Sequence, residues 1–155
     1  MFKEYRSLFI SILIPLGLGL LVGLLTRSGI NNLDNLVMPS FMPPAYLFAI
    51  IWPILYLLMG ISSYLVKESY SCYSGTCLLI YYVQLAVNLL WPIIFFVLDL
   101  RLFALIWIIL LVLLVLYMIW CFLGIKKAAA YLQIPYLLWL LFATFLNYSI
   151  YILNR

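Results

Sequence analysis

Amide and indole side chains interrupt a long apolar run at residues 84–96, whose sequence is QLAVNLLWPIIFF. At about 100° per residue, Gln84, Asn88 and Trp91 fall on one face of a helix, together with Phe95. Hydrocarbon offers an amide no hydrogen-bond partner, so this face is expected to look inward, at other helices or at a ligand. Two interpretations stay open, because such amides either hold membrane helices together or anchor a ligand in a cavity.

Most other chemistries lack the residues they need. The chain has no histidine, and every charged side chain lies at an expected helix end or in a loop. A Ser–His–Asp triad, a carboxylate-pair enzyme and a zinc site are therefore excluded, as is a transporter that needs an ionisable group at mid-membrane. Cys72 and Cys77 form no CxxC motif, and Cys121 is expected to be a lone, buried, small apolar side chain.

The composition is that of a membrane protein. Of the 155 residues, 70% are hydrophobic and 8% are charged, whereas soluble domains are about 25% charged. The apolar runs are continuous rather than alternating, which favours helices over a β-barrel. The net charge of +4 is spread over loops and termini, which suits anionic headgroups rather than nucleic acid. The sequence thus predicts an all-α integral membrane protein with one domain.

Five transmembrane helices in a single bundle are expected, at about residues 7–26, 44–67, 75–98, 102–123 and 128–153. The longest connection, residues 27–43, is expected to cover a pocket, because loops of this length are usually functional. In the first helix, Gly19 and Gly23 are four residues apart and predict close helix packing.

The fourth helix is nearly pure Leu, Ile and Val, so it is expected to face lipid or a partner subunit. Its Trp107 and Trp120 lie towards opposite ends and are interpreted as anchors at the two membrane surfaces.

The basic residues indicate an orientation. Five spans put the termini on opposite sides. The N-terminal side then carries Lys3, Arg6, Lys67, Lys126 and Lys127, and the other side carries Arg27, Arg101 and Arg155. This bias favours a cytoplasmic N-terminus, with Cys72 and Cys77 reduced in the cytoplasm.

Three helices place unusual residues at one depth beneath the long loop. With a rise of ~1.5 Å per residue in a core ~30 Å thick, Trp52, Asn88 and Trp91 lie roughly 10 to 15 Å deep. Trp139 falls near the midplane, and Asn147 lies between it and the surface. Interfacial tryptophans would be shallower. A pocket of aromatic rings and amides suits a large, flat, mostly apolar ligand.

Three motifs in this order resemble those of the tryptophan-rich sensory protein/translocator protein (TspO/MBR) family. They are WPILY at 52–56 followed by Met59-Gly60, QLAVNLLWPIIFF at 84–96, and PYLLWLLFATFLNY at 135–148. The resemblance runs from Pro43 to the C-terminus and is weakest in the fourth helix.

The resemblance implies a five-helix membrane fold, commonly a homodimer, without a resident cofactor. It implies a pocket for porphyrins, including protoporphyrin IX and haem, and for isoquinoline- and benzodiazepine-type drugs. The resemblance also includes bacterial members with a light- and oxygen-dependent porphyrin-degrading activity. For such an activity, Trp52 and Trp139 would be the catalytic residues. The implied pocket residues are Trp52, Tyr56, Asn88, Trp91, Trp139, Ala143 and Asn147.

Animal members of the family are also associated with cholesterol binding through a Tyr-x-x-x-Arg segment after the Asn-Tyr pair. Here Ile152 stands at the Arg distance from Tyr148, and only a shifted match, Leu146, Tyr151 and Arg155, fits the loose pattern. Short termini without a transit peptide favour a bacterial plasma membrane. Three functions stay open: a porphyrin-binding protein or sensor of tetrapyrrole homeostasis or stress, a porphyrin-degrading enzyme, and a transporter of porphyrin or sterol.

Overall fold

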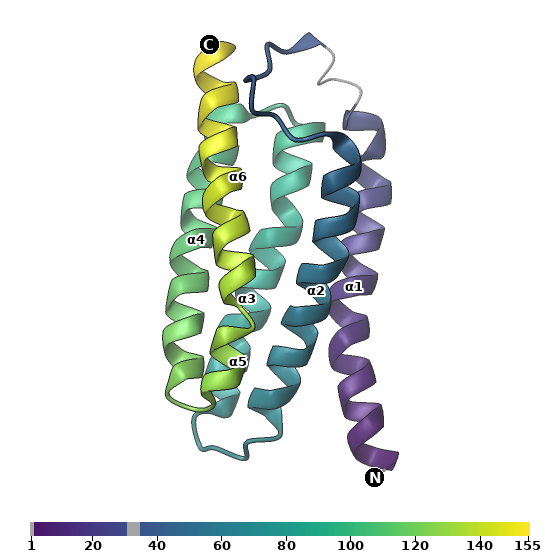
Figure 1. The fold of residues 1–155 in the computed structure, drawn as a ribbon, viewed down its shortest axis with the longest axis vertical. Coiled ribbons are helices and arrows are strands. Elements are labelled where there is room, and N and C mark those ends of the chain that lie inside the picture. The colour runs from purple at the N-terminus through teal and green to yellow at the C-terminus, as the bar shows by residue number, and fades with distance from the viewer. Residues whose placement is uncertain (1, 31–34) are drawn as a thin grey trace.

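The computed structural model describes residues 2–30 and 35–155, all as helices and their connections. The elements are α1 (Phe2–Ile30), α2 (Ala45–Lys67), α3 (Ser74–Pro92), the π-helix η2 (Ile93–Val97), α4 (Arg101–Leu123), α5 (Lys127–Tyr131) and α6 (Ile134–Leu153). Within this part of the chain, five segments are long and apolar enough to span a membrane: Tyr5–Gly29, Ala45–Lys67, Ser74–Val97, Arg101–Leu123 and Lys127–Leu153. They pack side by side with the termini at opposite ends (Figure 1). The predicted all-α integral membrane fold is confirmed.

Prolines interrupt two of the spans. Pro92 ends α3, and the chain continues as η2, in which the Leu98 N–H donates to the Ile93 carbonyl at 3.0 Å. A proline has no N–H to donate, so the α-helical ladder is lost at this point. Pro135 lies in the first turn of α6, just after the break that separates α5 from α6. The predicted helices at 75–98 and 128–153 are therefore each made of two segments.

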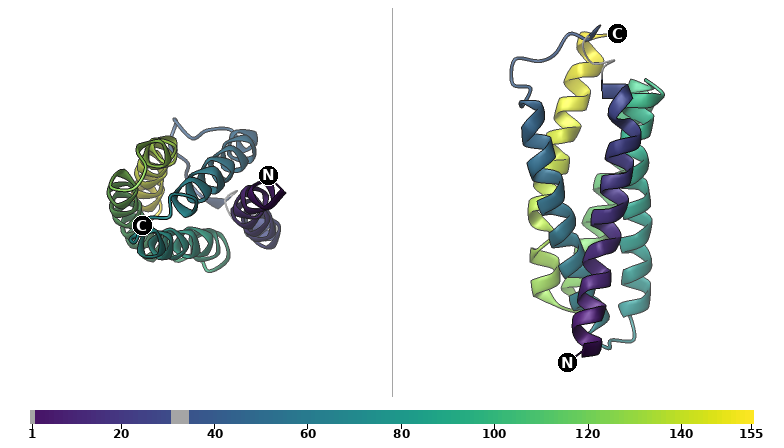
Figure 2. Two further views of the ribbon diagram at one scale, coloured as in Figure 1. Left: turned by 90° about the horizontal axis from the view of Figure 1, so that it is seen from below. Right: turned by 90° about the vertical axis from the view of Figure 1, so that its right-hand side faces the viewer.

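The fourth helix is predicted to face lipid or a partner subunit. Its outer face, with Ile106, Leu113 and Trp120, is exposed and can do so, but its other face is buried in the bundle. α4 buries the largest share of any span, 39%, whereas α1 buries 6%. Its inner face contributes Ala104, Ile108, Leu111, Val115, Met118, Ile119 and Phe122 to the interior. Seen end-on, α1 lies at the edge of the bundle beside α2 and α3 (Figure 2). Lipid and protein interior are equally apolar, so hydropathy cannot distinguish a buried helix face from a lipid-facing one.

The interpretation of Trp107 as an anchor at the membrane surface does not describe its contacts in the structure. Its side chain is half-buried, and the indole Nε1–H donates to the Val87 carbonyl of α3 at 2.8 Å. It therefore ties α4 to α3. Trp120 is 68% exposed on the outside of α4, as expected for an anchor.

Glycines let α1 approach α2. A Cβ on Gly19 would overlap the ring of Tyr56, whereas Gly23 has no atom within contact range. On α2, a Cβ on Gly60 would lie 2.5 Å from the Cα of Ile12 and 2.8 Å from the Ser11 carbonyl oxygen. One of the two predicted glycines thus packs, and Gly60 supplies the closest backbone approach between the helices.

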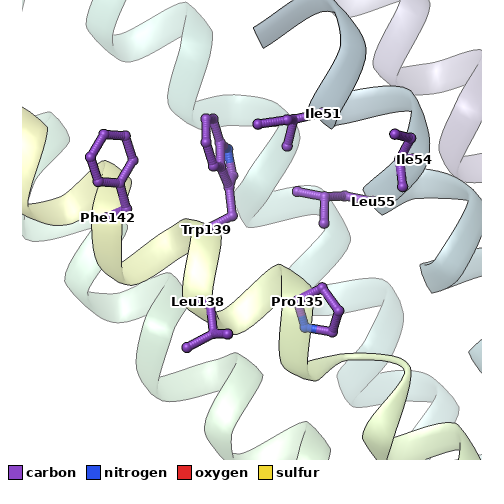
Figure 3. A pocket seen from close by; sticks show the side chains of 7 residues that line it. All are labelled: Ile51, Ile54, Leu55, Pro135, Leu138, Trp139 and Phe142. Carbon is purple, nitrogen blue, oxygen red and sulfur yellow. The ribbon is translucent and has the colours of Figure 1, made fainter. Parts of the chain in front are cut away.

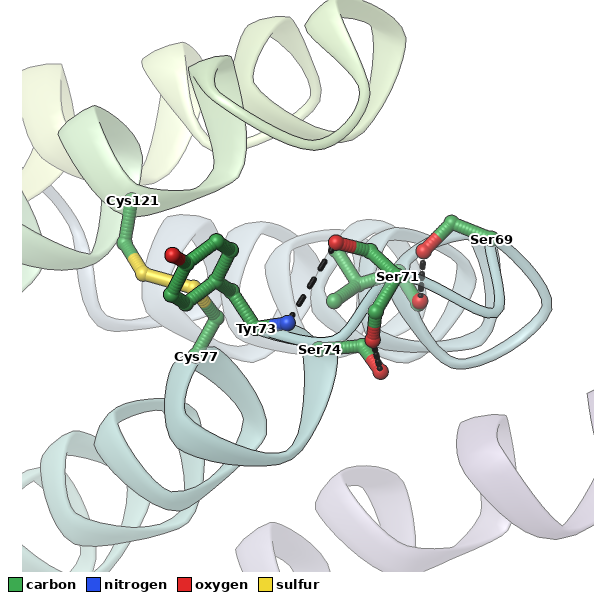
Figure 4. The surroundings of a disulfide bond; sticks show 7 residues. Ser69, Ser71, Tyr73, Ser74, Cys77 and Cys121 are labelled. Carbon is green, nitrogen blue, oxygen red and sulfur yellow. Dashed lines mark hydrogen bonds between the residues drawn. A yellow bond between two sulfur atoms is a disulfide. The ribbon is translucent and has the colours of Figure 1, made fainter.

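Cys77 and Cys121 form a disulfide between α3 and α4, with Cα atoms 5.9 Å apart (Figure 4). This corrects the expectation that Cys77 is reduced and that Cys121 has no partner. The physical reason is the antiparallel pairing of α3 with α4, which brings the start of one helix level with the end of the other. Cys72, on the adjoining loop, is a free, exposed thiol.

The long connection is shorter than predicted, because α1 continues to Ile30; residues 31–34 lie outside the described chain. The described part, residues 35–44, crosses the end of the bundle towards α6 (Figure 1). Asn154 holds it there: its Oδ1 accepts from the Val37 N–H at 2.8 Å, and its Nδ2 donates to the Val37 carbonyl at 2.9 Å. Phe41 stacks on Phe145 of α6 with centroids 5.1 Å apart.

Candidate functional site

A chain of buried hydrogen bonds joins α2, α3 and α6 inside the bundle. The Tyr56 hydroxyl donates to Asn88 Oδ1 at 2.9 Å, and Asn88 Nδ2 donates to the Tyr136 hydroxyl oxygen at 3.0 Å. The Tyr136 hydroxyl in turn donates to Gln84 Oε1 at 3.0 Å. The four side chains are buried. The inward orientation expected for Gln84 and Asn88 is therefore confirmed.

Beside this chain, a cavity of about 440 Å³ opens between α2 and α6. Its walls are apolar: Ile51, Ile54, Leu55, Pro135, Leu138, Trp139 and Phe142. Figure 3 shows Trp139 standing on α6 across from Ile51 and Leu55 of α2. At the rim, Ile54 and Leu138 are more than half exposed on the outer surface of the bundle. In a membrane this cavity would face the acyl chains of the lipid.

Three of the predicted pocket residues carry buried polar atoms without a partner in the described structure. They are the indole Nε1 of Trp91, the indole Nε1 of Trp139, and both amide atoms of Asn147. Buried polar groups are usually hydrogen-bonded, and an unpaired one requires an explanation. In this bundle the unpaired groups come from α3 and α6, the helices that also carry the amide–tyrosine chain.

Aromatic rings pack on the two indoles and on Tyr56. Trp52 packs on Tyr56 with centroids 5.5 Å apart, and Phe48 meets Trp139 edge-on at 5.4 Å. Trp91 stacks on Phe95 at 5.1 Å. The region can offer a flat apolar molecule several π-faces and a few hydrogen bonds.

The structure brings the predicted residues together in part. Tyr56 and Asn88 are directly bonded, Trp52 packs on Tyr56, and Trp139 lines the cavity. Ala143 is buried in the main hydrophobic cluster rather than on the cavity wall. The part of these residues in binding a ligand stays a prediction.

Two kinds of residue were missed. Tyr136 links Asn88 to Gln84, and its position three residues before Trp139, on the same side of the fifth span, was a usable signal. The aliphatic residues of the cavity wall, such as Ile51, Leu55 and Leu138, gave no signal in the sequence, because such side chains occur throughout every span. The residues of the shifted sterol pattern do not share one surface, because Leu146 is buried, whereas Arg155 is exposed beyond the end of α6.

Comparison with known proteins gives a consistent match. Residues 11–153 match the model of the TspO/MBR family. The chain is 35% identical over 149 residues to the tryptophan-rich protein TspO of Archaeoglobus fulgidus, covering 96% of this chain and 97% of that protein. It is 36% identical over 121 residues to a tryptophan-rich sensory protein of Cereibacter sphaeroides, covering 78% and 75%. It is 32% identical over 126 residues to the human translocator protein, covering 79% and 75%.

Proposed function

Because this chain belongs to the TspO/MBR family, we propose that it binds porphyrins such as protoporphyrin IX or haem between α2 and α6. Isoquinoline- and benzodiazepine-type molecules are proposed for the same place, since they are also flat and mostly apolar. The binding unit is proposed to be a homodimer in a bacterial plasma membrane, with its N-terminus in the cytoplasm and a role in tetrapyrrole homeostasis or stress signalling.

The observation that carries the proposal is the apolar cavity with Trp139 in its wall. Its volume of about 440 Å³ lies within the range of roughly 300–1,000 Å³ that is typical of small-molecule sites. Trp139 contributes an indole ring to this apolar surface, and its unpartnered N–H is buried behind the surface. A porphyrin offers a broad apolar face with carboxylate edges, and these features complement a ring-lined cavity with few donors.

Filling the cavity tests its role. Leu138→Trp adds a large ring to the cavity wall, and the matched control Leu141→Trp adds the same ring to an exposed position outside it. Protoporphyrin IX is titrated into each purified protein in lipid nanodiscs, with porphyrin absorbance as the readout. We expect Leu138→Trp to weaken binding and Leu141→Trp to leave it unchanged. Equal affinity in all three proteins contradicts the placement.

A second candidate function is light-driven porphyrin degradation, in which Trp52 and Trp139 carry the oxidation. Trp139 lines the cavity, so its indole would lie near a bound porphyrin. Trp52 packs on Tyr56 and is not part of the cavity wall. Turnover of many porphyrin equivalents per protein separates an enzyme from a binding protein.

A third candidate is transport of porphyrin or sterol. The apolar rim of the cavity lies on the outer surface of the bundle, which favours exchange with the lipid. Porphyrin flux into sealed proteoliposomes tests it.

A further inference from the structure

A second group of unpartnered polar atoms lies apart from the cavity walls. It comprises the Tyr81 hydroxyl, the Gln84 Nε2, and both amide atoms of Gln133. The Ser63 side chain of α2 lies near the Tyr81 hydroxyl and is the polar group closest to hand for it. The side chains of Tyr81, Gln84 and Gln133 are at most 1% exposed. Hydrocarbon and apolar side chains cannot bond these atoms, so leaving all four unpaired inside a membrane bundle is costly.

Helix register places these side chains at a similar level in the bundle. The Tyr136 hydroxyl is bonded to Gln84 Oε1 at 3.0 Å, which fixes the level at which α6 meets α3. Tyr81 precedes Gln84 by three residues, and Gln133 precedes Tyr136 by three, so each lies on the same helix face as its successor. α3 and α6 ascend in the same direction (Figure 1). Tyr81 and Gln133 therefore both lie about one turn below the Tyr136–Gln84 bond.

The backbone at this level is irregular as well. α5 ends at Tyr131 and α6 begins at Ile134, and Pro135 supplies no N–H to the carbonyl one turn before it. Irregular backbone at membrane depth is tolerated where it is buried in protein or lines a water-filled space. One group at the break is already satisfied by a side chain, because Ser62 Oγ donates to the Ala129 carbonyl at 2.7 Å. No such partner serves Gln133.

We propose that Tyr81, Gln84 and Gln133 enclose a buried water site in the interior of the bundle. The amide N–H groups of Gln84 and Gln133 donate to water, Gln133 Oε1 accepts from it, and the Tyr81 hydroxyl does either. Buried waters typically make about three hydrogen bonds to otherwise unsatisfied groups, and this site offers four atoms. A metal cation fits less well, because amide N–H donors repel it and no carboxylate is present among the three residues.

The water extends the hydrogen-bond chain that runs from Tyr56 through Asn88 and Tyr136 to Gln84. In that chain the Gln84 oxygen is already used by Tyr136, so the Gln84 N–H groups are the free end. Water at this end satisfies Gln84 and so supports the orientation of Asn88. The site does not depend on porphyrin binding, since none of its three residues lines the cavity.

Radiolytic labelling in H₂¹⁸O tests for bound water in the ligand-free protein. Hydroxyl radicals formed from a bound water modify the nearest ring, which mass spectrometry locates. Phe122 is the internal control, because it is as buried as Tyr81 but lies in the apolar interior. We expect ¹⁸O incorporation at Tyr81 to exceed that at Phe122 several-fold. Equal, low incorporation at both rings would overturn the proposal, since it would mean a dry site in which the amides pair with each other.

A variant tests the part played by Gln133. Gln133→Leu removes both amide atoms at similar volume, and Leu132→Met at the same break is the matched control. Tyr81 incorporation is expected to fall to the Phe122 level in Gln133→Leu and to stay at the wild-type level in Leu132→Met. Undiminished labelling in Gln133→Leu would overturn the assignment of Gln133 as a water ligand. If this variant does not fold, the wild-type comparison of Tyr81 with Phe122 still decides whether water is bound.

Discussion

The side-chain amide of Asn88 donates to the hydroxyl oxygen of Tyr136 at 3.0 Å, which joins the C-terminal part of α3 to the first turn of α6 inside the bundle. Asn88 also accepts from Tyr56, so this one amide connects three helices. Both of its polar atoms are satisfied by protein. Interhelical attachment is therefore a structural role of this amide, whatever it does for a ligand.

The first prediction concerns this attachment. Tyr136→Phe removes one oxygen and leaves Asn88 Nδ2 and Gln84 Oε1 without their partner. Each buried unpaired group costs ~1–3 kcal/mol, so we expect a clearly lower melting temperature in detergent. Tyr148→Phe, at a half-exposed position on the same helix, is the control and should leave the melting temperature unchanged. Equal melting temperatures for both variants would show that the chain contributes no stability.

Gly60 is expected to tolerate no side chain. Gly60→Ala places a methyl group 2.5 Å from the Ile12 backbone, so α1 must move away from α2. Overpacking of this kind typically costs ~1–3 kcal/mol. Gly23→Ala, where the added carbon meets nothing, should be neutral. Thermal unfolding of the two variants is the measurement, and matching curves would contradict the close contact between the helices.

The disulfide leads to a prediction about reactivity and orientation. In unreduced protein, maleimide should label Cys72 alone, and Cys77 and Cys121 should react only after reduction. Labelling of all three cysteines without reductant would contradict the bond.

The same end of the bundle carries conflicting signals about its compartment. Disulfides persist in oxidising compartments, whereas the Lys and Arg bias puts the loop that carries Cys72 in the cytoplasm. From the charge bias we expect Cys72 to be protected from an impermeant maleimide on intact cells and to react once the cells are lysed. Cys72→Ser, which keeps the disulfide pair, is the control. Labelling of Cys72 on intact cells would reverse the proposed orientation and place the disulfide in an oxidising compartment.

For the photochemical hypothesis, Trp52→Phe combined with Trp139→Phe keeps the apolar character of the site and removes both indoles. Porphyrin binding should fall only modestly, while light-driven loss of the porphyrin spectrum should largely stop. Trp120→Phe, on the exposed side of α4, is the matched control and should degrade porphyrin as the wild type does. Unchanged degradation in the double variant would mean that the protein merely solubilises a self-bleaching pigment.

Ala143 tests how far the ligand site extends along α6. Its side chain is buried in the main hydrophobic cluster, one turn beyond Trp139. Ala143→Phe overpacks this position, which typically lowers the free energy of unfolding by ~1–3 kcal/mol. If the site reaches Ala143, porphyrin affinity falls by roughly ten- to a hundredfold. Titration and thermal unfolding on one preparation measure both, and lower stability with unchanged affinity would make Ala143 a packing residue only.

The sequence by itself determined the membrane environment, the five spans and the inward face of the third. Each follows from a local property, either an apolar run long enough to cross the core or a polar group that hydrocarbon cannot satisfy. The buried positions of Gln84 and Asn88 bear this out. Local patterns of this kind predict the structure because lipid and protein interior impose the same requirement, namely that polar groups find hydrogen-bond partners within the protein.

Only the tertiary structure decided which helix buries the largest share of its residues, which side chains pair and where the cavity opens. The large buried share of α4 could not be predicted, because Leu and Ile side chains suit lipid and protein surroundings equally. The Cys77–Cys121 bond and the Trp107–Val87 contact depend on the level at which α3 and α4 pair. Tyr136 acquires its role by meeting residues about 50 positions away in the chain. Such contacts depend on how the helices are rotated and arranged around one another, which no single span encodes.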